Sequence, residues 1–348
     1  MKTNYQISVI ISTHNRSKLL LNCLKSLAKQ SIKHSSYELV VVDNYSNDHG
    51  FGTKNVCKKI TEKYPSLNIK TIFEKTVGGM TLAKHRAIKK SSGEIIVCAD
   101  DDYIAEFNLL KSALKCFSNE SIAAVCGKLY PIYQSSPPKW VKNITTSLPG
   151  KGYYIQDFTV IDLGRECVDV DWKYMFWSNW AIRRKIFDEL KGFGPDGFAG
   201  DFIFYNGNGE HFLNKEIARQ GYRTVYCSGM SAGHHISNYR FTKKYFQSRY
   251  FHYGISSSFE KVNTNKRVDS LLEIFFYILV ISRQIIKDLI SMPFFLKFRM
   301  IWVALGYWKH QKELRRNKFL LNYCKLDSYK NYKFSNLIPI QNKESSLW

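Results

Sequence analysis

The chain has 348 residues, of which 45% are hydrophobic and 15% aromatic, so it can bury a large core, and an intrinsically disordered protein is excluded. Its 51 Lys and Arg residues outnumber its 29 Asp and Glu residues. The formal net charge of +22 therefore predicts an anionic partner, such as a nucleic acid, an anionic lipid or a phosphorylated substrate.

Cysteine usage indicates the redox environment. The eight cysteines show no CxxC pair and no paired spacing, which argues against a disulfide framework or a zinc site. We expect reduced cysteines in a cytoplasmic protein.

Strands and helices alternate along the first ninety residues. Apolar runs predict strands at residues 6–12, 37–42 and 68–73, and apolar side chains at helical spacing predict helices at residues 17–30, 54–64 and 78–90. This alternation with short connections predicts an α/β fold with a doubly wound, mostly parallel sheet. Neither GxxxxGK[ST] nor GxGxxG follows the first strand, which excludes a P-loop and a dinucleotide-binding fold.

A buried strand at Glu94–Ala99 ends on three consecutive carboxylates, Asp100, Asp101 and Asp102. Open α/β sheets bind their ligands at this end of a strand, and three adjacent carboxylates repel one another unless a cation lies nearby. Asp100 and Asp102 would point the same way on an extended chain and suit Mg²⁺ or Mn²⁺. Alternatively, Asp102 caps a helix at Ile104–Phe117. These residues alone leave both interpretations open.

Several segments together resemble the family 2 glycosyltransferases with the GT-A fold. They are SVIISTHNR at residues 8–16, ELVVVDNYS at residues 38–46, Ala-Lys-His at residues 83–85, and Gly93-Glu94 before Asp100–Asp102. The resemblance covers roughly residues 5–260. It implies a nucleotide-sugar donor, most readily a UDP-sugar, whose diphosphate is reached through a divalent metal on the DxD motif.

The resemblance also implies the donor-binding residues, which are Thr13, Asn15, Arg16, Asp43, Lys84, Asp100, Asp101 and Asp102. Lys84-His85 stands where the family has Arg-Asn, and Ala87 stands where it has glycine. Because lysine keeps the charge of arginine but lacks its planar fork, we expect altered contacts to the donor at this position.

The aromatic segment Trp172–Arg184 has two interpretations. Such clusters commonly form part of a core, but aromatic rings with an amide also stack on and hydrogen-bond to a sugar. The segment resembles the acceptor side of the family, which implies that Trp177, Asn179 and Trp180 bind the acceptor.

A helix opens at Glu210-His211, where the family has two acids of which one is the general base. Either residue here can accept a proton, and Glu210 is the first choice. Alternatively, Glu210 only stabilises the helix N-terminus. The other candidate acids are Asp188, Asp196 and Asp201.

A further strand at Val225–Cys227 precedes His234 and His235. The resemblance implies that one of them, His234 before His235, joins Asp100 and Asp102 as a metal ligand. Imidazole with two carboxylates favours Mn²⁺ over Mg²⁺. The basic residues that follow are expected to face phosphate groups, namely Arg240, Lys243, Lys244 and Arg249.

From Leu271 to Trp308 apolar runs are interrupted by charges, and none reaches the roughly 20 residues that span a bilayer. Aromatic and basic residues together predict helices lying on an anionic membrane surface. Alternatively, they pack on the catalytic domain or on a second subunit. We therefore divide the chain into a GT-A domain at residues 1–260 (donor half 1–130, acceptor half 131–260), an amphipathic extension at 261–320 and a polar tail at 321–348.

These observations predict an inverting, metal-dependent glycosyltransferase of bacterial surface polysaccharide or lipopolysaccharide synthesis. Its acceptor would be a glycan or a polyprenyl- or other lipid-linked glycan. The enzyme would be cytoplasmic and peripheral on the inner face of the plasma membrane. The alternatives are a sugar nucleotidyltransferase and a basic nucleic-acid-binding module, although no nucleic-acid-binding motif is present, and we expect no nucleic-acid partner.

Overall fold

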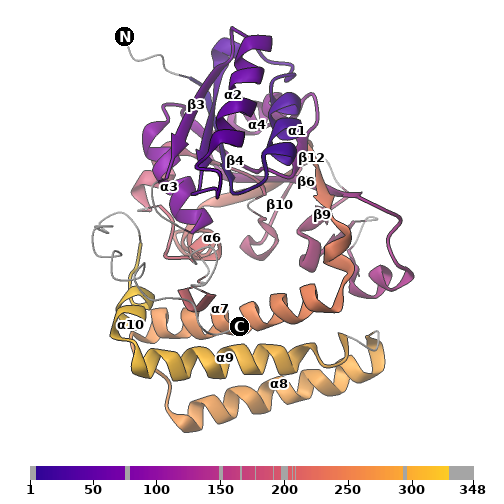
Figure 1. Cartoon of the computed structure of the whole chain (residues 1–348), viewed down its shortest axis with the longest axis vertical. Coiled ribbons are helices and arrows are strands. Elements are labelled where there is room, and N and C mark those ends of the chain that lie inside the picture. Colours follow the sequence, from indigo (N-terminus) through magenta and orange to yellow (C-terminus); the bar gives the residue numbers. More distant parts are fainter. Residues whose placement is uncertain are drawn as a thin grey trace.

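A computed structural model describes residues 5–74, 79–148, 152–164, 167–176, 178–190, 192–196, 203–205, 207, 209–292 and 296–328. These residues form an α/β domain that rests on a layer of C-terminal helices (Figure 1). The order of strands and helices in the first half confirms the predicted fold class.

The described strands form one 12-stranded sheet. Its parallel part has the order β3-β2-β1-β4, and β11 then joins β4 to β6 with antiparallel pairing on both sides. The strands are β1 Ile7–Thr13, β2 Tyr37–Asp43, β3 Asn68–Phe73, β4 Ile95–Asp100, β5 Tyr103–Ala105, β6 Ile122–Tyr133, β7 Thr146–Ser147, β8 Tyr153–Ile155, β9 Val160–Asp162, β10 Cys167–Asp169, β11 Asn179–Arg183 and β12 Arg223–Ile236.

Helices cover both faces of this sheet. They are α1 Ser17–Leu27, α2 Phe51–Lys63, α3 Met80–Lys90, α4 Leu109–Phe117, α5 Arg184–Glu189, α6 Gly209–Arg219, α7 Lys243–Asn265, α8 Leu271–Ser291, α9 Arg299–Arg316 and α10 Lys318–Cys324. On β1, Val9 and Ile11 join a core with α1, α2 and α4, whereas Ile10 joins a second core with α3, α5 and α6. Because successive strand side chains alternate between faces, the continuous apolar run of β1 fits a strand covered on both sides.

The segment after the three aspartates differs from the prediction of a helix at residues 104–117. Residues Tyr103–Ala105 form β5, which pairs with β12, and α4 begins at Leu109 with Asn108 before it. The interpretation of Asp102 as the cap of this helix is therefore wrong, because the strand pairing keeps the chain extended beyond Asp102.

Strand β12 is longer than the predicted Val225–Cys227. It pairs with β6 along most of its length, loses register between Cys227 and Ala232, and resumes to Ile236. In its second part His234 lies opposite Tyr103 of β5. This pairing brings the histidine pair next to the end of β4, although the two segments are far apart in sequence.

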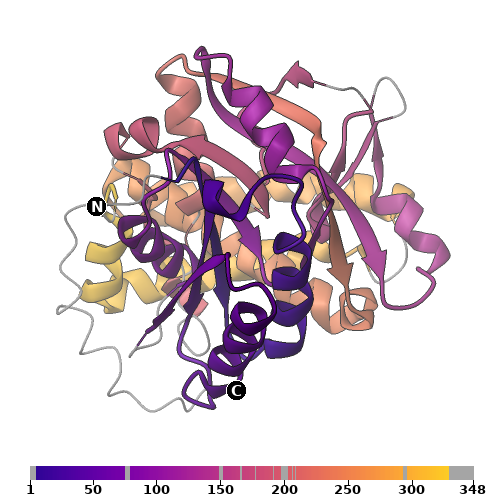
Figure 2. The same ribbon diagram turned by 90° about the horizontal axis from the view of Figure 1, so that it is seen from above.

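The C-terminal helices lie beneath the sheet domain. In Figure 2, which is seen from above, they are the orange and yellow helices behind that domain. Helices α7 and α9 touch through glycines. A Cβ atom on Gly254 of α7 would lie 2.0 Å from the Val303 carbonyl oxygen, and one on Gly306 of α9 would lie 2.0 Å from the Phe251 carbonyl oxygen. The two backbones therefore approach more closely than any side chain at these positions allows.

The predicted domain boundaries at residues 260/261 and 320/321 fall inside α7 and α10. Tyr323 of α10 is buried against Phe259 of α7, and both belong to the core that holds β4. The helices α7 and α10 are thus packed on the sheet domain, because their apolar side chains complete its core. The rest of the predicted tail, residues 329–348, lies outside the described residues.

Within the described segments, no helix combines the length and the apolar character that crossing a membrane requires. Helix α8 runs along the lower edge of the molecule in Figure 1, and it exposes apolar side chains. They include Leu271, Leu272, Phe275, Phe276, Leu279 and Val280, which are between 46% and 79% exposed. We call these six residues the α8 apolar face.

Candidate active site

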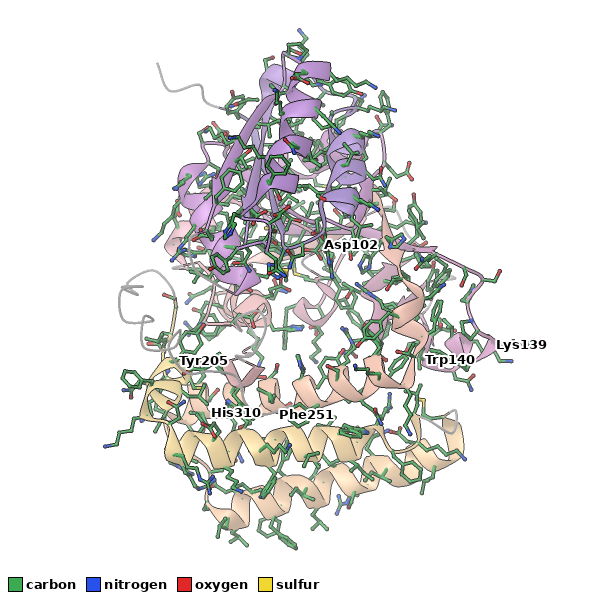
Figure 3. The ribbon with its side chains drawn as sticks, viewed as in Figure 1. Asp102, Lys139, Trp140, Tyr205, Phe251 and His310 are labelled. Atoms are coloured by element: carbon green, nitrogen blue, oxygen red, sulfur yellow. The ribbon has the colours of Figure 1, made fainter. Side chains whose placement is uncertain are left out.

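Polar side chains gather where β1 and β4 end. The two strands are parallel neighbours in which Ser12 lies opposite Asp100, so Thr13 and the three aspartates meet at one edge of the sheet. Asp102 lies at the end of the sheet domain that faces α7 (Figure 3). This is the edge at which open α/β sheets bind their ligands.

Asp100 is held by a buried lysine. Lys84 of α3, only 1% exposed, donates from Nζ to Asp100 Oδ1 over 3.0 Å, and the Ser178 hydroxyl donates to Asp100 Oδ2. Burial by itself would raise the pKa of Asp100, but the Lys84 charge and these hydrogen bonds outweigh it and lower the pKa. Asp100 is therefore ionised at neutral pH, and its charge is balanced by Lys84.

Asp101 connects the end of β4 to β1 and to the turn that follows β1. The Thr13 hydroxyl donates to Asp101 Oδ2 over 2.7 Å, and Arg16 Nη1 donates to Asp101 Oδ1 over 3.1 Å. Burial raises the pKa of Asp101 to about 6, although Arg16 acts in the opposite direction. Thr13, Arg16 and Asp101 thus fix the loop beside the predicted diphosphate site.

Asp102 lies among cationic and imidazole groups. Its Oδ2 accepts hydrogen bonds from Arg16 Nη1 at 3.3 Å and Arg240 Nη2 at 3.4 Å, and its Oδ1 lies 3.4 Å from His234 Nε2. Burial alone would raise the pKa of Asp102, but the adjacent His234 ring and the Arg240 guanidinium lower it. His235 contributes its backbone N–H to the Asp102 carbonyl oxygen. Since strand side chains alternate, His234 is the histidine that faces Asp102.

These residues fit a divalent metal in part. Among the described residues, no three His, Cys, Asp or Glu side chains are gathered closely enough to coordinate one ion by themselves. Asp102 Oδ1 is buried without a hydrogen bond and faces His234 Nε2, so these two atoms are suited as ligands. Mg²⁺-type ions commonly take only one or two carboxylates and complete their shell with substrate phosphates and water. Asp100 is turned toward Lys84 and Ser178 instead, so the predicted pair of aspartate ligands is not assembled here.

Glu210 stands in the first turn of α6 and faces the same lysine. Its Oε1 lies 3.7 Å from Lys84 Nζ and makes no hydrogen bond. Burial raises the pKa of Glu210 to about 7; Lys84 opposes this shift, whereas the nearby Asp100 and Asp196 reinforce it. A carboxylate that titrates near neutral pH is suited to accept a proton.

His211 points elsewhere. Its ring meets the Trp172 ring edge-on, with the ring centres 6.1 Å apart, and burial lowers its pKa, so it is neutral at pH 7. Among the other candidate acids, Asp196 accepts a hydrogen bond from the Thr81 hydroxyl at 2.7 Å, and Asp188 is exposed on α5. Asp201 lies outside the described residues. Of the acids described, Glu210 combines proximity to Asp100 with a neutral-range pKa.

A protein-family comparison now connects this geometry to an activity. The model of "Glycosyl transferase family 2" matches residues 8–191, which is more than half of the chain. The chain belongs to glycosyltransferase family 2. Family membership decides for a glycosyltransferase over a sugar nucleotidyltransferase or a nucleic-acid-binding module.

Curated relatives include other glycosyltransferases of surface polymers. The O-antigen chain rhamnosyltransferase RfbN of Salmonella typhimurium is 24% identical over 252 residues, which cover 72% of each chain. The poly(ribitol-phosphate) beta-glucosyltransferase of Bacillus spizizenii is 34% identical over 137 residues, which cover 38% of this chain and 20% of that protein.

Among solved structures, the mannosyltransferase PcManGT of Pyrobaculum calidifontis, in complex with GDP-Man and Mn²⁺, resembles the chain with a TM-score of 0.52. The alignment covers 99% of this chain and 77% of that one at 17% identity. At this identity the likeness concerns the fold alone. Together with the family match, it confirms the predicted GT-A fold.

Two predicted acceptor-binding residues of this glycosyltransferase are part of its core. Asn179 and Trp180 on β11 are completely buried. Asn179 donates to the carbonyl oxygens of Lys128 and Met230 and accepts from the Tyr103 hydroxyl. The structure therefore does not support the predicted contact of these two residues with the acceptor, because β11 lies between β4 and β6 inside the sheet. Trp177, the third predicted acceptor residue, lies outside the described residues.

The predicted donor-binding residues Asp43 and Asn15 shape two neighbouring turns. The buried Asp43 carboxylate accepts hydrogen bonds from the Ser46 backbone and hydroxyl and from the Thr53 hydroxyl. Asn15 has a φ of 55° and accepts from the Asn47 backbone through Oδ1. Asp43 thus holds the β2–α2 turn, and a direct contact with a nucleoside would require that turn to open.

Ser178 is a site residue of the glycosyltransferase that the sequence did not reveal. A serine after an aromatic run does not by itself indicate a site residue. Ser178 comes to lie beside Asp100 because β11 pairs antiparallel with β4, so that Asn179 lies opposite Ala99. The predicted phosphate contact of Arg249 is likewise not supported, because this side chain is bonded to Asp157, away from Asp102.

Proposed function

We propose that this glycosyltransferase is inverting and metal-dependent. It would transfer a sugar from a nucleotide-sugar donor, with UDP-sugars as the first candidates, to a hydroxyl group of a glycan or lipid-linked glycan. The observation that carries the proposal is the position of Lys84 between Asp100 Oδ1 at 3.0 Å and Glu210 Oε1 at 3.7 Å. This lysine places a proton acceptor directly beside the DxD motif.

In this mechanism Glu210 accepts the proton of the acceptor hydroxyl as the oxygen attacks the anomeric carbon. One positioned base suffices for a single displacement, and such a base typically contributes about 10²–10⁴-fold to the rate. Lys84 holds Glu210 and Asp100 in fixed positions and stays protonated, since the nearby carboxylates raise its pKa even though burial opposes them.

The donor diphosphate would lie beside Arg16 and Arg240. Both guanidinium groups are already aimed at Asp102, and planar guanidinium groups bind phosphate through paired hydrogen bonds. A divalent ion held by Asp102 and His234 would act as a Lewis acid on the leaving diphosphate. An imidazole ligand favours Mn²⁺ over Mg²⁺.

The relatives support bacterial surface polymers as the product class. RfbN is described as an O-antigen chain enzyme and the Bacillus spizizenii protein as a poly(ribitol-phosphate) enzyme. We therefore extend the proposal to polysaccharide synthesis, with a glycan or polyprenyl-linked glycan as acceptor. The sugar that is transferred is left open by these relatives, since their names differ in this respect.

The α8 apolar face supports a peripheral position on the cytoplasmic face of the plasma membrane. It includes Leu271, 79% exposed, and Val280, 64% exposed. Exposed basic residues follow on α8, α9 and α10, namely Arg283, Lys312, Arg315, Arg316 and Lys318. Exposed apolar side chains together with exposed basic ones are the combination by which interfacial helices bind anionic lipid.

Thermal unfolding with nucleoside diphosphates tests the donor and metal parts of the proposal. A ligand at about 100 times its Kd should stabilise the protein by about 2.7 kcal/mol. We expect the largest stabilisation with nucleotide and Mn²⁺ together, and its loss in Asp102→Asn. Asp188→Asn, a change of an exposed aspartate on α5, is the matched control and should behave as the wild type. Equal stabilisation of Asp102→Asn and wild type would contradict the metal assignment.

A further inference from the structure

A cavity of about 600 Å³ lies between α7 and the catalytic domain. It falls within the size range of small-molecule sites, about 300–1,000 Å³. Gln156 and Tyr239 line it from the domain, His211 lines it from α6, and the remaining lining residues come from α7. Because His211 follows Glu210 directly, the cavity adjoins the helical turn that carries the proposed base.

The lining residues of α7 form one stripe. They are Tyr245, Ser248, Arg249, His252, Tyr253, Ser256, Ser257 and Glu260, which recur three or four positions apart and so share one face of the helix. At 1.5 Å per residue, this stripe is about 22 Å long. We call it the α7 stripe.

The cavity is electrically balanced although the whole chain carries +22. Arg249 donates to Asp157 Oδ1 at 3.3 Å and to the Gln156 carbonyl oxygen at 2.9 Å, and Glu260 forms an ion pair with Lys215. Burial lowers the pKa of His211 and of His252, so both rings are neutral at pH 7. An anionic ligand would therefore meet no unbalanced positive charge here.

The groups that remain are aromatic rings and neutral hydrogen-bonding groups. Tyr253 stands with its ring 5.1 Å from the Arg249 guanidinium, and Tyr239 meets Tyr245 edge-on at 5.8 Å. Arg249 lies over one face of the Tyr253 ring and of the Tyr245 ring. Tyrosine rings pack against the C–H surface of a sugar, while serine hydroxyls and imidazoles can bond its hydroxyl groups. Nothing in this lining favours a phosphate over a neutral sugar.

We infer that this cavity binds an uncharged sugar of the acceptor glycan, beside the helical turn that carries Glu210. The inference rests on the proposed function, because it makes the cavity the acceptor site of that reaction. It also replaces the buried Asn179 and Trp180 as the acceptor-binding surface. Any phosphate of a lipid-linked acceptor would lie outside the cavity.

The test compares three proteins on an array of neutral, uronic-acid-containing and phosphorylated bacterial oligosaccharides. Ser248→Trp places an indole at an exposed position of the α7 stripe, whereas Asn265→Trp places the same group at the exposed last residue of α7, outside the cavity. We expect the wild type to be retained by neutral glycans. Ser248→Trp should bind at least about tenfold more weakly, and Asn265→Trp within about twofold of the wild type.

Three results would overturn the inference: Ser248→Trp binding as tightly as the wild type, preferential retention on phosphorylated glycans, or no retention of the wild type on any glycan. Stabilisation by nucleoside diphosphates is measured on the same three proteins and should be equal. If nucleoside diphosphates did not stabilise the wild type, the proposed function would be contradicted. Sugar binding in the cavity is tested by the glycan array alone.

Discussion

The pH dependence of turnover is the most direct test of the role of Glu210. Burial raises the pKa of this carboxyl group to about 7, so about a tenth of it is ionised at pH 6 and about nine-tenths at pH 8. If the ionised form accepts the proton, turnover should rise about tenfold across this interval and level off above it. Glu210→Gln should lower turnover by about 10²–10⁴-fold and leave donor binding nearly unchanged.

The same group should affect stability in the opposite direction. The folded protein keeps a proton on Glu210 that the unfolded chain loses above pH 4.5, so the free energy of unfolding should fall between pH 4.5 and pH 7 and not beyond. The rise in the pKa of Glu210 from 4.5 to about 7 corresponds to a loss of about 3 kcal/mol in the free energy of unfolding, at about 1.36 kcal/mol per pKa unit. Glu210→Gln should therefore be the more stable protein at pH 8.

The assay measures initial rates of nucleoside diphosphate release at saturating donor and acceptor from pH 5.5 to 8.5, together with urea unfolding at the same pH values. Asp188→Asn, a change of an exposed acid on α5, is the control and should keep the wild-type pH profile, whereas His211→Gln tests the neighbouring residue as the alternative base. A flat pH profile, or Glu210→Gln within about tenfold of the wild type, would refute the reasoning. A mild Glu210→Gln combined with a crippled His211→Gln would make His211 the base.

Four further outcomes follow from the structure. EDTA should abolish transfer and Mn²⁺ should restore it; full activity in chelator would contradict metal dependence. Lys84→Met should lower stability by about 1–3 kcal/mol in urea unfolding, because it leaves the partly buried Asp100 without its counter-charge. Trp180→Ala should cost about 3–5 kcal/mol, since the ring is completely buried; a cost below about 1 kcal/mol would contradict its place in the core. In flotation assays the wild type should bind anionic liposomes, whereas Leu272→Glu with Val280→Glu should not; equal flotation of both would contradict docking through the α8 apolar face.

The donor half of the site could be predicted because its information is local. Apolar runs that end on polar residues define β1 and β4. Parallel pairing of these two strands is sufficient to place Thr13 and Asp100 at one edge of the sheet. The family pattern of two acids at the start of a helix indicates Glu210 as the candidate base, and the structure places its Oε1 atom 3.7 Å from Lys84 Nζ.

The acceptor half could not be predicted because its contacts depend on distant pairings. Trp180 and a sugar-stacking tryptophan look alike in a sequence, and only the insertion of β11 between β4 and β6 makes this ring a core residue. Similarly, the α7 stripe has no apolar periodicity of its own, and it becomes a cavity wall only because α7 packs beneath the sheet domain.

Helix α7 packs against α9 with one face and lines the cavity with another. Gly254 and Gly306 tie the outer face of α7 to α9 at backbone distance, so substitutions there would push the two helices apart. The α7 stripe lies on the other face and meets the sheet domain through side chains, such as Arg249 with Asp157 and Glu260 with Lys215. Acceptor preference could therefore diversify, by natural drift or in a directed library confined to the stripe, while the supporting scaffold is inherited unchanged.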